Sequence, residues 1–128
     1  MSSHPATPAW YKWAGLACTY LPCLLLFVSA AFKFKGGPDF EKGFTEHMGW
    51  PMALAANLGI LEIACTVIYL IPRTAVLGAV LLTGYLGGAI ATHVRVGDPF
   101  VTQFLLGVTI WGGIWFRDAR LRALMPLN

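Results

Sequence analysis

The chain has 128 residues, of which 57% are hydrophobic and only 12% are charged, and its formal net charge is +3. Ordinary soluble domains carry about a quarter charged residues, and a small domain exposes a large share of its surface. This composition disfavours a water-soluble globular protein. The basic residues form no run interleaved with aromatic residues, so nothing supports nucleic-acid binding.

Four apolar stretches follow one another along the chain, each close to the roughly 20 residues that cross a bilayer as a helix. We expect membrane spans at about residues 13–33, 50–71, 74–94 and 99–117. The first is longer than the apolar core of about 7–15 residues in a signal peptide, so we expect it to be retained. The short Pro72-Arg73 break predicts an antiparallel hairpin between the second and third spans. The predicted fold class is an all-α integral membrane protein, a four-helix transmembrane bundle in a single domain over residues 1–128.

The orientation of the spans follows from the basic residues near their ends. With four spans, both termini and the Pro72-Arg73 turn share one side. That side carries Lys12, Arg73, Arg117, Arg120 and Arg122, and the other carries Lys33, Lys35, Lys42 and Arg95. The excess of five over four favours termini on the cytoplasmic side of the membrane.

Small residues indicate where helices approach one another in lipid. The third span contains Gly84 and Gly88 at the spacing of a Gly-x-x-x-Gly pair, with Gly87 beside them. We expect this part of the span to pack against another helix.

Glu62 is the most informative single residue, because it falls near the middle of the second span. A carboxylate at that depth costs a few kcal/mol unless it is partnered or neutral. Small and polar residues share its helix face, among them Gly59, Thr66 and Tyr69. We expect Glu62 to face an internal pocket that opens toward Lys33, His47 and His93. A neutral glutamic acid bonded to a Tyr or Thr of another helix is the alternative.

Further polar residues lie at the ends of the spans or inside them. Lys33, His47, His93 and Asp98 are all expected at one membrane face, where they would line the mouth of the pocket. The candidate catalytic residues are Glu62, His93 and Lys33. The candidate ligand-binding residues are His47, Asn57, Tyr85, Thr92 and Asp98. Hydrogen bonds between helices would also account for Asn57, Tyr85 and Thr92.

Metal and thiol chemistry find little support in the residue pattern. No His-x-x-x-His or Glu-x-x-His spacing occurs within a span, so we expect no metal or haem site. Cys18, Cys23 and Cys65 are best explained as small packing residues. A bound quinone remains compatible with this pattern.

Several segments carry a resemblance to a known family. They are Phe44-Thr45-Glu46-His47-Met48-Gly49-Trp50-Pro51, Leu58-Gly59-Ile60-Leu61-Glu62, Ile71-Pro72-Arg73-Thr74 and the run from Gly78 to Val94. Over about residues 15–116 the layout resembles the DoxX-like family of small four-span bacterial membrane proteins. The resemblance implies an inner-membrane location. It also implies that the polar positions typical of the family are Lys33, His47, Glu62, His93 and Asp98.

The resemblance allows three functions. Some members of the broad family are subunits linked to quinone-dependent oxidation of thiosulfate and to other redox assemblies. The first hypothesis is therefore an accessory subunit that binds a small lipophilic or quinone-like ligand beside Glu62, with a membrane redox protein or a second copy as partner. The second is a membrane-embedded enzyme that uses Glu62 with His93 or Lys33 as acid and base. The third is a subunit of a transporter.

Overall fold

The computed structural model describes residues 7–125, which contain helices and no strand. The four long helices are α1 (Trp10–Lys35), α3 (Ala53–Leu70), α4 (Ala75–Arg95) and α5 (Val101–Arg117). The shorter elements are α2 (Pro38–Glu41), the π-helical segment η1 (Lys42–His47), the 3-10 turn η2 (Pro72–Thr74) and α6 (Ala119–Leu124). The predicted all-α fold is confirmed, and each expected span coincides with a long helix to within about three residues at either end.

Within the described residues, three segments are long and apolar enough to cross a membrane. They are Trp10–Lys35, Ala53–Leu70 and Pro72–Arg95. The fourth long helix, α5, has 17 residues and is shorter than these three. The membrane character of the fold is therefore supported by three helices, and a count of four spans stays a prediction.

The helices end where local backbone chemistry stops them. Gly36 follows α1 with a positive φ of 67°, and its N–H donates to the carbonyl of Phe32. Gly97 has a φ of 78° just beyond α4. Such backbone conformations favour glycine. Between α3 and α4, Ile71 is extended because it precedes Pro72. This turn produces the predicted antiparallel hairpin.

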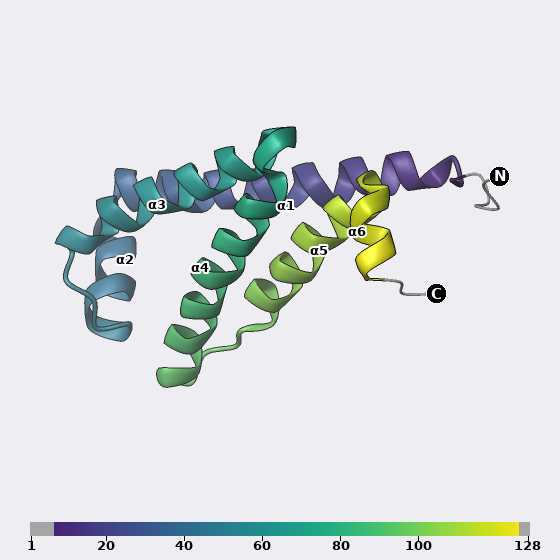
Figure 1. The fold of residues 1–128 in the computed structure, drawn as a ribbon. Coiled ribbons are helices and arrows are strands. Elements are labelled where there is room, and N and C mark those ends of the chain that lie inside the picture. Colours follow the sequence, from purple (N-terminus) through teal and green to yellow (C-terminus); the bar gives the residue numbers. More distant parts are fainter. Residues whose placement is uncertain (1–6, 126–128) are drawn as a thin grey trace, which may run out of the picture.

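The long helices are arranged as two antiparallel pairs (Figure 1). α3 lies beside α1, and the α4–α5 hairpin leans away from that pair. Each of the four packs against two others: α1 against α3 and α5, and α4 against α3 and α5. The start of α1 and the short helix α6 lie at the same end of the molecule. The helices thus converge around the middle of α1 and separate toward the α4–α5 loop.

Tyr69 marks the point where the four helices converge. Its side chain is fully buried, and its hydroxyl donates a hydrogen bond of 2.6 Å to the carbonyl of Ile110 in α5. A Cβ atom on Gly113 would lie 2.7 Å from this hydroxyl. A Cβ atom on Gly78 would lie 2.3 Å from the Tyr69 backbone. These two glycines permit the close approach of α5 and α4 to Tyr69.

Among residues 7–125, the expected packing of Gly84, Gly87 and Gly88 against another helix is not found. A Cβ atom at any of the three would have no heavy atom within 4 Å. The spacing of the glycines does not determine which face of α4 packs against another helix. α4 meets α3 beside Gly78, near the hairpin turn, and the three later glycines lie on its exposed face.

Candidate functional site

Glu62 lies inside the molecule, in the middle of α3, and is 2% exposed. Its carboxylate is paired with Lys33 of α1, whose Nζ lies 3.1 Å from Oε1. The side chain of Lys33 is 15% exposed, so the pair is nearly enclosed. Two unit charges removed from water in this way attract each other strongly, but both also lose hydration. This ion pair is the centre of the candidate site.

Small and polar residues on both helices allow Lys33 to reach Glu62. Gly59 lies one turn before Glu62, and a Cβ atom there would come within 3.4 Å of the Lys33 Cβ and 3.1 Å of the Phe34 ring. The absence of a side chain at Gly59 thus makes room for the stem of Lys33. Ser29, one turn before Lys33, accepts a hydrogen bond of 2.8 Å from Nζ. The ammonium group is therefore held from both sides.

A third helix completes the surroundings of the ion pair. Tyr85 of α4 places its phenol beside the Glu62 carboxyl group. Thr66 donates a hydrogen bond of 2.7 Å to the backbone carbonyl of Glu62 rather than to its carboxylate. Glu62 is thus surrounded by Lys33, Tyr85 and apolar residues of α1, α3 and α4. The ion pair with Lys33 differs from the alternative of a neutral glutamic acid bonded to a Tyr or Thr of another helix.

The hydrogen-bond capacity of the ion pair is only partly used. An ammonium group has three N–H donors, and in the described residues Lys33 directs two of them to Ser29 and Glu62. One donor remains for an oxygen atom of a ligand. The contact between a base and an acid could also support proton transfer.

Two other predicted residues of the membrane face, His47 and Asp98, are brought together in a separate group. His47 at the end of η1 donates a hydrogen bond of 2.7 Å to Asp98, which lies between α4 and α5. Arg95 bonds to the carbonyl of Met48, and its guanidinium lies 5.0 Å from the centre of the Trp50 ring. These contacts hold the segment before α3 against the α4–α5 loop. They are exposed, unlike the Lys33–Glu62 pair.

His93 belongs to neither group. Its Nδ1 donates a hydrogen bond of 2.7 Å to the carbonyl of Ala89, and its Nε2 lies 3.5 Å from the amide nitrogen of Gln103. No hydrogen bond joins it to Lys33 or Glu62 in the described part of the chain. The structure therefore brings together Glu62 and Lys33, but not His93, among the three candidate catalytic residues.

Two of the candidate ligand-binding residues, Asn57 and Thr92, lie away from the ion pair. Asn57 is exposed on α3, and Thr92 bonds to the carbonyl of Gly88 in its own helix. The cavity where α1 begins and α5 ends, and a second cavity between α4 and α5, are not lined by Glu62.

Within residues 7–125, no group of three or more His, Cys, Asp or Glu side chains is placed to hold a metal ion.

Sequence reasoning did not identify Ser29 and did not assign Gly59 a role in the site. The signal for Ser29 was its position four residues before Lys33, on the same face of a helix. The signal for Gly59 was its position three residues before a buried charge. Both become informative only once Lys33 and Glu62 are known to meet.

Comparison with protein families identifies the chain. A family model described as the DoxX-like family matches residues 17–115, which include the Lys33–Glu62 pair, all of α3 and α4 and most of α1 and α5. No curated protein and no solved structure shows significant similarity to the chain. The matched segment covers most of the sequence, and the chain belongs to the DoxX-like family.

Proposed function

We propose that this chain is a four-span inner-membrane protein that binds a small lipophilic, quinone-like ligand at the Lys33–Glu62 pair. It would serve as a subunit or accessory of a membrane redox process. The observation that carries the proposal is the buried ion pair itself. Replacing such a pair by apolar residues is often neutral or stabilising, so its presence favours a functional role. Intramembrane ionisable residues are functional candidates for the same reason.

The free N–H of Lys33 indicates the chemistry of the ligand. It offers a charged donor at the one member of the pair that is still 15% exposed. A carbonyl oxygen on a lipophilic molecule is a suitable acceptor, and the neighbouring apolar surface would accommodate the rest of that molecule. A quinone combines these two properties. Tyr85 and Ser29 would hold the pair in place while the ligand binds.

The fourth span of this proposal is α5. Its 17 residues are uncharged before Arg117 and, at the helical rise of about 1.5 Å per residue, extend about 25 Å. Its outward side carries the exposed apolar residues Phe104, Leu105 and Val108. A helix of this kind is stable next to lipid when it is slightly shorter than the bilayer core.

A membrane-embedded enzyme is the second candidate, and the same contact favours it. Lys33 and Glu62 could exchange a proton with a lipophilic substrate as acid and base. His93 is a weaker partner for this chemistry, because it bonds to Ala89 and approaches Gln103. Recovery of a chemically changed ligand from the purified protein would distinguish this function from binding alone.

The test is binding of decylubiquinone, a short-chain quinone, to the detergent-solubilised full chain, measured by equilibrium dialysis. We expect Lys33→Met to weaken binding at least tenfold, because a charge-assisted hydrogen bond contributes about 1.5–3 kcal/mol. The matched control is Lys35→Met, which removes an exposed lysine from the same helix end. The double variant Lys33→Met/Glu62→Leu replaces the pair by apolar side chains and keeps the test valid if a single variant unfolds. Equal binding by the wild type and the folded double variant would overturn the proposal.

A further inference from the structure

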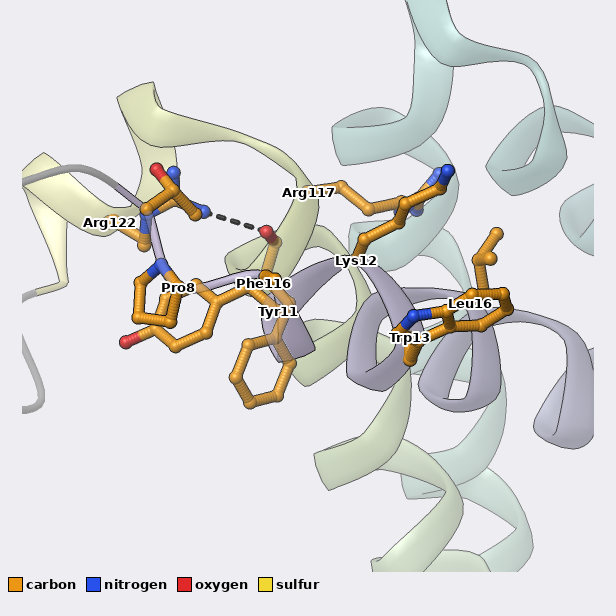
Figure 2. A pocket seen from close by; sticks show the side chains of 10 residues that line it. Pro8, Tyr11, Lys12, Trp13, Leu16, Phe116, Arg117 and Arg122 are labelled. Carbon is orange, nitrogen blue, oxygen red and sulfur yellow. Dashed lines mark hydrogen bonds between the residues drawn. The ribbon is translucent and has the colours of Figure 1, made fainter.

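A cavity lies far from the ion pair, where α1 begins and α5 ends (Figure 2). Its volume is about 600 Å³. Three basic side chains line it: Lys12 from the first turn of α1, Arg117 from the end of α5, and Arg122 from α6. No acidic side chain is among its lining residues. The cavity is thus a concentration of positive charge at one end of the molecule.

The charges in this cavity have no carboxylate partner in the described part of the chain. The ion pairs there involve Lys33, His47 and Arg120 instead. Arg122 donates two hydrogen bonds of 2.8 Å to the carbonyls of Trp115 and Phe116, which offsets part of its charge at the end of α5. The positive charges of Lys12 and Arg117 are offset by fewer hydrogen bonds than that of Arg122.

Arg117 and Lys12 reach toward the same side of the cavity in Figure 2. Arg117 donates through Nε to the carbonyl of Gly113, at 2.9 Å, and its remaining N–H groups make no hydrogen bond to the described residues. Lys12 makes no hydrogen bond there either, and its nearest aromatic partner is Trp13, 5.7 Å from Nζ to the ring centre. Like charges that share a cavity repel each other, and a bound anion would relieve that repulsion.

A glycine in α1 makes room for the side chain of Arg117. A Cβ atom on Gly15 would lie 2.9 Å from the Cγ of Arg117, so the glycine allows the aliphatic part of the arginine to pack directly against α1. The guanidinium then lies 5.6 Å from the centre of the Tyr69 ring. Arg117 is exposed to solvent, but its stem packs against α1 and its guanidinium lies near the Tyr69 ring, which favours a positioned cation over a freely moving surface charge.

Apolar surface continues from the cavity along the outward face of α1. Trp13, which lines the cavity, is 69% exposed, and Tyr20 and Leu24 follow it on the same side of the helix. α1 is one of the helices long and apolar enough to cross a membrane. A ligand that joins an anionic head to long hydrocarbon chains matches both parts of this surface.

We propose that Lys12 and Arg117 bind the phosphate group of an anionic phospholipid, with Arg122 at the rim and the acyl chains along α1. A guanidinium binds phosphate oxygens with geometrically matched donors, and an ammonium group adds a point charge. Basic cavities between membrane helices bind anionic lipid headgroups in this way. Free phosphate shares the head chemistry but does not use the apolar surface of Trp13 and Leu24. The site is independent of the ligand proposed at Lys33 and Glu62.

The test counts lipids retained by the full chain in an uncharged detergent, using native mass spectrometry with dioleoylphosphatidylglycerol and dioleoylphosphatidylcholine. We expect preferential retention of the phosphatidylglycerol. Because each basic residue near an anionic lipid contributes about 1 kcal/mol, Lys12→Gln and Arg117→Gln should each weaken its retention about fivefold. Lys12→Arg should keep it. The matched control is Arg120→Gln, since Arg120 is 88% exposed, is paired with Asp118 and does not line the cavity.

Three results would overturn the proposal. Equal retention of the two lipids would show that the charge of the headgroup is not recognised. An equal loss in Arg120→Gln would indicate diffuse attraction by surface charge. Displacement of the lipid by glycerol 3-phosphate at the same concentration would identify a site for a free phosphate instead. Because Lys12 makes no hydrogen bond to the described residues, Lys12→Gln is expected to fold and keeps the test decisive.

Discussion

Removing one member of the Lys33–Glu62 pair should destabilise the protein far more than removing both. At 3.1 Å and an effective dielectric constant of about 20, two unit charges attract by about 5 kcal/mol. A single substitution that leaves a buried charge unpaired costs about 3–5 kcal/mol. We expect the cost of Lys33→Met to lie near the upper end of this range, because Glu62 is only 2% exposed. Glu62→Gln should cost less, because the longer lysine side chain can move toward the surface.

The double variant Lys33→Met/Glu62→Leu should be about as stable as the wild type, since apolar replacements of a buried pair are often neutral or stabilising. The free energies of unfolding would be measured on the full chain in detergent micelles, by denaturant titration followed by circular dichroism. Lys33→Met, Glu62→Leu and the double variant form a cycle whose coupling free energy should be at least about 2 kcal/mol. Lys35→Met, at the exposed end of α1, should change stability by no more than about 0.5 kcal/mol.

Additive effects would refute this reasoning. If each single variant lost less than about 1 kcal/mol, as exposed ion pairs do, and the double variant lost their sum, then Lys33 and Glu62 would not be paired and buried. The binding experiment with decylubiquinone would then also lose its structural basis. A large coupling without quinone binding would instead retain the ion pair and reject only the ligand.

Three further predictions concern orientation, packing and pH. A cytoplasmic reporter fused after Asn128 should be active and a periplasmic one inactive, and the reverse activities would show that the topology is inverted. Gly78→Ala should lower the free energy of unfolding by about 1–3 kcal/mol or more, because its Cβ would lie 2.3 Å from the Tyr69 backbone. The control Gly84→Ala has open space around it and should leave the free energy of unfolding unchanged or raise it by about 0.5–1 kcal/mol. The side-chain hydrogen bond from Arg120 lowers the pKa of Asp118 below its ordinary value of 3.8. The stabilisation from Asp118 is therefore fully present above pH 3.8 and is lost as the pH falls through the lower pKa of the folded state. An acid titration of helicity should show this loss of stability in the wild type but not in Asp118→Asn.

The positions of the helices could be predicted from the sequence because hydropathy and helix-ending residues act locally. Span boundaries from apolar length agree with α1, α3, α4 and α5, and the hairpin at Pro72 follows from two adjacent residues. The face on which each helix packs is a different kind of information. The Gly84–Gly88 spacing is recognisable in the sequence. The direction in which α4 leaves the hairpin turn, however, places Gly78 and not these glycines against Tyr69 of α3.

The candidate site shows the same division between local and tertiary information. The depth of Glu62 in its span predicted burial, and burial is found. The contact with Lys33 is harder to predict. Lys33 ends the first span at the membrane face, whereas the eleven residues from Pro51 to Glu62 correspond to about 16 Å at the helical rise, which puts Glu62 well below that face. That estimate assumed that α1 ends level with the start of α3. The connection over residues 36–52 contains α2 and η1, and it lets the end of α1 lie level with the middle of α3.

The long connection also explains why the polar residues form two groups instead of one lining. It carries His47 to Asp98 and Met48 to Arg95, so two of the residues expected at the mouth of the pocket, His47 and Asp98, bond to each other beside the α4–α5 loop. Lys33 is then free to pair with Glu62 instead of joining them. An apolar pair at these two positions would fold at least as well. The features that such a pair could not provide are a charged donor and a carboxylate within an apolar environment, and these are the features that a lipophilic, hydrogen-bonding ligand requires.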